Sequence, residues 1–494
     1  MKNKFIHIIR TKPVFLYLLP LFFVLHGFTE NYDLIPVKDA VILALFYTGV
    51  ALLIALLFWL LYRNFRKANL IVFLMLSYQF FFGSVYDFLK KNLHESFLTR
   101  YSFILPVTLL IFLFAIIFLK KTKRPLLRIT LYLNMLLLLL ILTDTGWLML
   151  KAGKKQNISV TVNEIFTPCD ICKKPDIYLI IADGYPGRIE LRDIFNYDNS
   201  SFENELKKRK FYLVDSSSSN YNFTPFSVSS MFDMSYLRGL AGSNTNKNDI
   251  SLCYNTLKKS KLMQFLRKKG YEFYNYSIFD FIKQPSLARP TFLPRKTGPL
   301  TSQTFSHRLI RDLGYHLVTT FKLPSSIRQL RNADLTNNNK LFSLTIETAG
   351  KFSDKPRFVY THLVMPHYPY YFDSSGKVVP YKLLTDESPF DKKAFIGYLQ
   401  YGNKKYLELI DHLLSSSATP PIIILIGDHG FREFKDSVES KYHFMNLNAV
   451  LLPDSNYSGF YKGQSNVNQF RIILNSQFGQ HLPLLKDSTS FLTE

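Results

Sequence analysis

The segments DIYLIIADG (residues 176–184), FVYTHLVMPHYP (358–369) and IIILIGDHG (422–430) decide the fold of this chain. Each contains an apolar run of strand length that leads into acidic or histidine residues. In sheets of parallel strands, ligands bind beyond the carboxyl ends of the strands. The residues at these ends are therefore the candidates for a functional site: Asp183, His362, His367, Asp428 and His429.

Six β-rich runs alternate with helical patterns in the C-terminal two thirds of the chain. The runs cover residues 176–182, 211–214, 271–276, 357–363, 421–427 and 448–452. Helix candidates between them include residues 256–269, which Gly270 closes, and residues 392–414. Strands that alternate with helices form a parallel or mostly parallel sheet covered by helices on both faces. The sequence therefore predicts an α/β domain with a mostly parallel sheet over residues 176–494.

Most long apolar runs lie before residue 151. Five stretches approach the roughly 20 residues that a bilayer core requires: residues 13–28, 41–62, 70–88, 102–119 and 126–150. No small-residue cleavage site follows the first stretch, so it is interpreted as a span and not as a signal peptide. The sequence predicts a transmembrane domain of five spans over residues 1–150 and a linker over residues 151–175.

The orientation of the spans follows from the loops, because Lys and Arg near span ends stay in the cytoplasm. Basic residues concentrate before the first span and in the second and fourth loops, whereas the first loop is acidic and the third is mixed. An odd number of spans then carries everything after residue 150 outside. The net charge of +23 is dispersed in the C-terminal part, which favours solvated helix faces over a nucleic-acid groove. Attraction to an anionic membrane surface or a phosphorylated substrate stays open.

The linker contains Cys169 and Cys172, and the only other cysteine is Cys253. A zinc site would need four ligands, and no second CxxC or paired histidine lies nearby. A local disulfide in an oxidising compartment is the favoured interpretation. A reactive thiol pair is the alternative.

Asp428 and His429 give the most specific site signal. An Asp-Gly pair after a strand, as at Asp183, is usually a turn. An Asp-His-Gly sequence after a fully apolar strand is more specific, and a carboxylate oxygen with an imidazole nitrogen suits zinc or manganese. Isolated histidines such as His367 and His443 are more often surface or packing residues.

Thr224 is a candidate nucleophile within SNYNFTPFSVSSMFDM (219–234). Pro225 and a helix-compatible apolar pattern follow it, so Thr224 is predicted to be a helix N-cap with proline at the first helical position. That structural role needs no catalysis. The same position favours negative charge on the hydroxyl by about 0.3–1 kcal/mol. A bound divalent metal strongly activates a coordinated water and is expected to activate a threonine hydroxyl in the same direction.

The order of these residues resembles the alkaline phosphatase superfamily, specifically its sulfatase-like membrane branch of phosphoethanolamine transferases and lipoteichoic acid synthases. Those enzymes also carry five membrane spans before an extracytoplasmic catalytic domain. The resemblance implies a sulfatase-like domain on the outer side of a bacterial cytoplasmic membrane. It implies that Thr224 is the nucleophile and that Asp183, Thr224, Asp428 and His429 bind one divalent metal, zinc or manganese. It also implies that His367 and His443 contact the substrate phosphate or a second metal.

Three positions depart from the family patterns. Leu363 stands where relatives with two firmly bound metals have Asp four residues before the first of these histidines, which argues against a permanent second metal. Asp183 stands where the phosphoethanolamine transferases have Glu. The segment around Thr224 lacks the cysteine and arginine of a formylglycine motif, which argues against an arylsulfatase.

The resemblance implies transfer of a phosphoethanolamine or phosphoglycerol head group from a membrane phospholipid to an envelope glycan or lipid, through a phosphothreonine intermediate. Two alternatives stay open: a membrane-anchored phosphodiesterase or sulfatase-like hydrolase, and a non-catalytic envelope-assembly protein. No nucleic-acid partner is expected. Residues 295–335 carry no clear motif, and they are expected either to cover the cleft or to meet the membrane.

Overall fold

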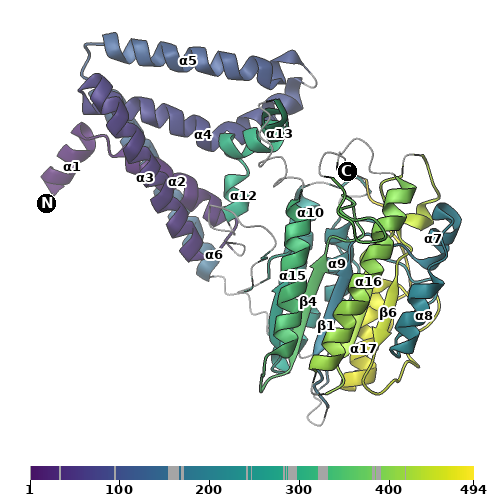
Figure 1. Ribbon diagram of the computed structural model, residues 1–494. Helices are drawn as coiled ribbons and strands as arrows, with labels where there is room; N and C mark the ends of the chain where they lie inside the picture. Colours follow the sequence, from purple (N-terminus) through teal and green to yellow (C-terminus); the bar gives the residue numbers. More distant parts are fainter. Residues whose placement is uncertain are drawn as a thin grey trace. The chain divides into compact units, whose positions relative to one another are not determined.

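The chain divides into two compact units in the computed structural model (Figure 1). The first unit contains residues 1–156 and 290–327, and the second contains residues 157–289 and 328–494. The structure describes the chain except for residues 1, 33–34, 94–95, 154–165, 168–171, 241–242, 246, 282–283, 285, 288–296, 321–331, 381–383, 385–390, 418, 435 and 494. Residues 290–327, distant in sequence from the N-terminal helices, thus group with them.

The first unit is helical. Its N-terminal helices are α1 (Lys2–Thr11), α2 (Phe15–Glu30), α3 (Val37–Tyr62), α4 (Phe65–Leu93), α5 (Tyr101–Lys121) and α6 (Leu127–Gly153). Among the described residues, α3, α4, α5 and α6 are long and apolar enough to cross a membrane. The prediction of five spans is therefore wrong for the first stretch, which forms α2 and has only 16 residues. At 1.5 Å per residue it is about 24 Å long, less than a bilayer core of about 30 Å.

Packing explains how the short helix α2 is accommodated. Phe15, Leu16 and Leu19 are almost fully buried, since α2 lies against α3, α4 and α6. The side chain of Asn134 on α6 accepts a hydrogen bond from the Phe15 amide and donates to the carbonyls of Ile9 and Lys12. This asparagine satisfies the backbone groups that the break between α1 and α2 leaves unpaired.

A six-stranded sheet forms the centre of the second unit. Its order is β2 (Tyr212–Leu213), β6 (Asn448–Leu451), β5 (Ile422–Gly427), β1 (Ile177–Ala182), β4 (Arg357–Leu363) and β3 (Glu272–Tyr276). Only β6 runs antiparallel to its neighbours, β5 and β2. All six predicted strands are present, and the prediction of a mostly parallel sheet is confirmed.

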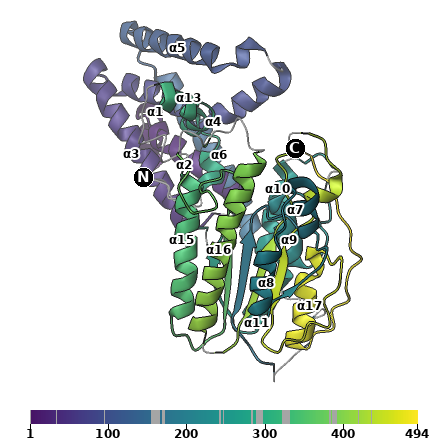
Figure 2. The same ribbon diagram turned by 45° about the vertical axis from the view of Figure 1, so that its right-hand side comes forward.

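Helices cover both faces of this sheet (Figure 2). Ile177, Leu179 and Ile181 of β1 pack in one apolar cluster with α9 (Thr224–Asp233), α11 (Lys261–Lys268) and α17 (Asn466–Phe478). The intervening side chains of β1 pack in a second cluster with α7 (Arg188–Phe195), α8 (Ser200–Lys208), α15 (Ala333–Gly350) and α16 (Lys392–Ser416). A strand buried on both faces is apolar along its whole length, which explains why β1 reads as a continuous apolar run.

Two helix predictions have different outcomes. The helix predicted over residues 392–414 is present as α16. The helix predicted over residues 256–269 is interrupted, because α10 (Lys247–Lys258) ends within this range and α11 begins after an extended Ser260. At 100° per residue, a continuous helix would place Leu257 and Leu262 on different faces. The break lets both side chains enter the same core cluster.

In the linker, Cys172 takes part in a disulfide bond. Cys169, its predicted partner, lies outside the described residues. Cys253 is a buried free thiol.

Candidate metal centre

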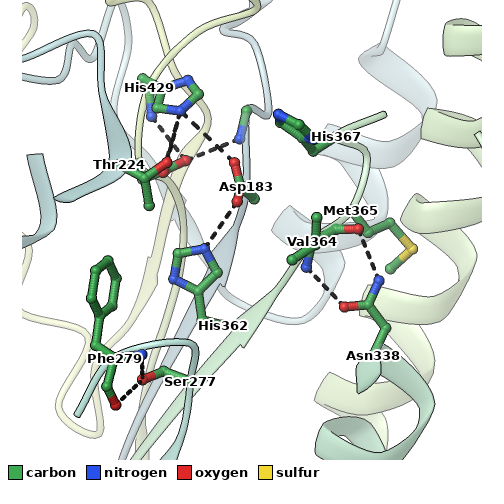
Figure 3. A network of polar contacts seen from close by, with 12 residues as sticks. Asp183, Thr224, Ser277, Phe279, Asn338, His362, Val364, Met365, His367 and His429 are labelled. Atoms are coloured by element: carbon green, nitrogen blue, oxygen red, sulfur yellow. Dashed lines mark hydrogen bonds and ion pairs between the residues drawn. The ribbon is translucent and has the colours of Figure 1, made fainter. Parts of the chain in front are cut away.

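The three central strands bring the predicted ligands together. Strand β1 lies between β4 and β5, and Ala182 is in register with both Leu363 and Gly427. Asp183 and Asp428, each one residue beyond its strand, therefore lie side by side at the carboxyl edge of the sheet. Figure 3 shows Asp183, Thr224, His362, His367 and His429 gathered at this edge.

Each oxygen of Asp183 has a different environment. The Oδ2 atom lies 3.2 Å from His362 Nε2. The Oδ1 atom is buried without a hydrogen-bond partner in the described part of the chain, and it lies 3.8 Å from His429 Nε2. Burial alone would raise the pKa of Asp183, but the charge of His367 and the hydrogen bond from His362 lower it far below its ordinary value. Asp183 is therefore a carboxylate with one oxygen available.

Asp428 shows the same division. Its Oδ1 atom accepts hydrogen bonds from the amides of Gly184, at 2.9 Å, and His429, at 3.1 Å. Its Oδ2 atom is buried, has no hydrogen-bond partner among the described residues and lies 3.4 Å from His429 Nε2. One oxygen is thus held by the backbone, and the other is aimed at the same point as Asp183 Oδ1.

The ring of His429 is held in the tautomer that can bind a metal through Nε2. Its Nδ1 atom lies 2.7 Å from the carbonyl oxygen of Gly430, which accepts a hydrogen bond from it. The proton on Nδ1 leaves a lone pair on Nε2, as in histidines that bind metals. Burial lowers the pKa of His429, so the ring is neutral at neutral pH.

Thr224 completes the group. Helix α9 begins at Thr224 itself, with Phe223 as its N-cap and without a side-chain capping bond. The predicted N-cap role for Thr224 is therefore wrong by one residue, and its hydroxyl does not cap the helix. The Oγ1 atom instead lies 3.1 Å from His429 Nε2. Pro225 has a fixed φ that suits the first turn of the helix. The Thr224 side chain is not used as a cap and faces the strand ends.

These atoms fit a divalent cation. Asp183 Oδ1, Asp428 Oδ2, Thr224 Oγ1 and His429 Nε2 come together, and the two carboxylate oxygens have no hydrogen-bond partner among the residues that the structure describes. Oxygen and imidazole ligands in this number suit zinc or manganese. The second atom of Asp183, Asp428 and His429 is hydrogen-bonded, which is the outer support that metal ligands need.

His362, one of the candidates at the strand ends, belongs to the site, although its role was not predicted from the sequence. Asp183, His362 and Asp428 also have ligand atoms within 4.8 Å of one another. However, His362 Nε2 already pairs with Asp183 Oδ2, and its Nδ1 lies 2.9 Å from the hydroxyl of Tyr360. Because Asp183 Oδ1 faces His429 instead, we assign His362 to the support of Asp183. An imidazole on the buried, otherwise apolar face of β4 was the signal that could have revealed it.

His367 lies in the loop after β4 and is paired with an acidic residue that the sequence analysis missed. Its Nδ1 donates to the carbonyl of Tyr368 at 2.6 Å, and its Nε2 lies 3.5 Å from Glu433 Oε1. Burial lowers the pKa of His367, but Asp183 and Glu433 outweigh this effect and raise it to about 9. His367 is therefore a cation at neutral pH.

His443 makes no hydrogen bond to the four converging side chains. It ends the 3-10 helix η4 (Ser440–His443), and its carbonyl accepts a hydrogen bond from the Gly430 amide at 3.0 Å. Its buried Nδ1 has no partner within the described part of the chain. Burial lowers the pKa of His443, and the nearby positive charge of Arg432 lowers it further. His443 thus offers a neutral ring beside the site.

Comparison with known proteins gives only structural matches. No protein-family model matches the chain, and no curated protein matches it. The lipooligosaccharide phosphoethanolamine transferase A of Neisseria meningitidis is 12% identical, with a TM-score of 0.38, and the match covers 94% of this chain and 95% of that one. The periplasmic domain of the phosphoethanolamine transferase EptC from Campylobacter jejuni is 16% identical, with a TM-score of 0.36, and the match covers 63% of this chain and 91% of that one.

A phosphonate monoester hydrolase of Agrobacterium radiobacter also matches, with 13% identity and a TM-score of 0.38 over 64% of this chain and 77% of that one. The three matches are likenesses of fold. Their scores and identities are low, so the function proposed below is based on the side chains of this site.

Replacing His362 is expected to weaken metal binding. In His362→Asn the hydrogen bond that orients Asp183 is lost, so metal affinity should fall about 10–100-fold, measured by competition with a chelator. His412→Asn, which changes an exposed histidine on α16, is the matched control. Equal affinities of the two variants would contradict the role assigned to His362.

The protonated form of His367 is expected to stabilise the metal-free protein. Because its folded pKa of about 9 exceeds the ordinary 6.5, this stabilisation is complete below pH 6.5 and is lost as the pH rises through about 9. In thermal melts of metal-free protein, His367→Gln should therefore lower Tm more at pH 6.5 than above pH 9. A pH-independent difference would show that the charge of His367 does not contribute.

Proposed function

We propose that this protein transfers a phospho-head group, of phosphoethanolamine or phosphoglycerol type, from a membrane phospholipid to an envelope glycan or lipid, with Thr224 as the nucleophile. The observation that carries the proposal is the position of the Thr224 hydroxyl, 3.1 Å from His429 Nε2 and beside two unpaired carboxylate oxygens. A threonine hydroxyl is a weak nucleophile unless a base or a metal activates it. This arrangement supports such activation.

Asp183, Thr224, Asp428 and His429 would hold one divalent cation, zinc or manganese. When bound, the cation supplies Lewis-acid stabilisation of negative charge and lowers the pKa of the hydroxyl that it contacts. We propose no permanent second metal, because Leu363 cannot act as a ligand. His367 and His443 are then available for the substrate.

In the first step, Thr224 Oγ1 bonds to phosphorus and gives up its proton. The bond between phosphorus and the lipid glycerol oxygen breaks, and that oxygen leaves as the alcohol after taking up a proton. The product is a phosphothreonine that carries the head group. Negative charge on the non-bridging oxygens needs fixed positive partners, and we assign this role to the His367 cation and, as a neutral donor, to His443.

Arg432 is a further candidate for binding these oxygens. Its guanidinium lies 4.9 Å from the ring of Phe223, the residue before Thr224. Its Nε is buried and has no hydrogen-bond partner in the described part of the chain. A planar guanidinium is well suited to phosphate.

In the second step, a hydroxyl or phosphate oxygen of the acceptor bonds to phosphorus, and Thr224 regains its proton. The membrane-spanning helices support a lipid donor, because such a donor must be met at the bilayer surface. If water took the place of the acceptor, the same first step would make the protein a phosphodiesterase. A non-catalytic assembly protein would have no use for the unpaired ligand atoms.

Thr224 is expected to carry the transferred group. Mass spectrometry of intact protein from membranes should find a mass addition on Thr224, and its size identifies the head group. The addition should be absent from Thr224→Ala. Products formed from phosphatidylethanolamine or phosphatidylglycerol, with and without an envelope acceptor, separate transfer from hydrolysis, since free head group under all conditions indicates hydrolysis. Full activity of Thr224→Ala on both donors would refute the proposal.

Metal content gives an independent prediction. The purified protein should contain about one equivalent of zinc or manganese, and Asp428→Asn should lose it together with activity, because a carboxylate ligand is removed. Asp411→Asn, at an exposed carboxylate on α16, should keep both. Metal-free protein with full biological activity would favour the assembly role.

A further inference from the structure

Residues 297–313 pack against the membrane helices, although they lie between β3 and α15 in the sequence. They include α12 (Gly298–Thr301) and the first half of α13 (Phe305–Thr320). This segment belongs to the first unit, so the chain passes between the two units three times. Of the two roles expected for residues 295–335, contact with the N-terminal helices is the one that the structure supports.

Polar contacts join α13 to α4 and α5. Arg308 is buried, and its guanidinium donates to Asp87 Oδ2 at 2.7 Å and to Gln303 Oε1 at 3.0 Å. The hydroxyl of Tyr101 at the start of α5 donates to Asp312 Oδ2 at 2.7 Å. A buried, hydrogen-bonded arginine is held strongly, because removing its partner would leave an uncompensated charge.

Close apolar packing supplements these bonds. The ring of Phe305 lies 4.9 Å from that of Tyr78 and 5.0 Å from that of Phe82. A Cβ atom on Gly27 of α2 would lie 2.5 Å from Leu300 Cγ, and one on Gly83 of α4 would lie 2.5 Å from the Gln303 carbonyl oxygen. Glycine disfavours a helix by about 1 kcal/mol relative to alanine, and these two positions leave room for no larger residue.

Most of the contacts lie toward the ends of the helices that the positive-inside rule places outside the cell, whereas Tyr78 lies near the middle of α4. Gly27 is near the C-terminal end of α2, Gly83 and Asp87 lie in the C-terminal half of α4, and Tyr101 begins α5. The Lys151 ammonium at the end of α6 donates to the Thr29 carbonyl of α2 at 2.7 Å. The chain therefore leaves α6 at the same end of α2 that Leu300 contacts, which is consistent with one extracytoplasmic side.

We propose that residues 297–313 are a second membrane attachment of the catalytic part of the chain, independent of α6 and the linker. The segment docks on α2, α4 and α5 through Arg308, Phe305 and the two glycines. On the opposite side of α13, Ile310 is 66% exposed, as suits a residue that faces lipid. The attachment fixes a second point of the catalytic part at the bilayer surface.

Cutting the linker tests this proposal. A protease site inserted between residues 156 and 157 allows the full-length protein to be cleaved in isolated membranes, which are then washed with salt. The C-terminal fragment should stay with the membranes. It should be released from Gly27→Ala/Gly83→Ala, whose added methyl groups displace the segment. Gly49→Ala/Gly146→Ala is the matched control, because nothing lies within 4 Å of a Cβ at either position, and it should retain the fragment.

Two results would overturn the proposal: release of the fragment from the unaltered glycines, or equal retention in both double variants. A cooperative thermal melt of a released fragment shows that its release is not the result of misfolding. Membrane retention is measured without any enzymatic assay, so its outcome is separate from that of the function proposed above.

Discussion

The site depends on two buried carboxylates that each direct one unpaired oxygen toward His429. Removing a carboxylate from water costs several kcal/mol unless the charge is compensated. Two such groups close together would normally raise one pKa, yet the pKa of Asp183 is lowered because His367 and His362 outweigh its burial. The two cations His367 and Arg432 do not balance the three carboxylates of Asp183, Asp428 and Glu433. A further cation would compensate the remaining negative charge of these buried carboxylates. A bound metal ion fits this requirement.

The sequence was sufficient to predict the site residues that directly follow apolar strands. All six strands were predicted from their apolar runs, and the rule for the carboxyl edges of parallel sheets then placed Asp183 and Asp428 together. This prediction is correct because β4, β1 and β5 are adjacent and their last residues are in register. Thr224 was found through its helix start, although the helix begins at Thr224 and not after it.

The remaining features depend on contacts that no local pattern encodes. His362 supports Asp183 because two side chains from neighbouring strands face the same way, and Glu433 meets His367 across two loops. The short helix α2 is apolar like a span, and the sequence pattern did not reveal that it has only 16 residues and packs against the longer helices. Residues 297–313 carry no recognisable motif. Part of their packing depends on Gly27 and Gly83, which contribute only the absence of a side chain, and a sequence pattern does not show that two segments fit together in this way.

Gly430 explains why the segment after β5 has a glycine after Asp428 and His429. Asp428 and His429 supply ligand atoms, whereas Gly430 connects them to the rest of the site. Its carbonyl oxygen accepts a hydrogen bond from His429 Nδ1, and its amide donates a hydrogen bond to the His443 carbonyl oxygen. A Cβ atom at Gly430 would overlap the Tyr442 carbonyl oxygen, so any larger residue would push η4 away. The same glycine therefore sets the tautomer of His429, the proposed metal ligand, and the position of His443, which we propose contacts the substrate.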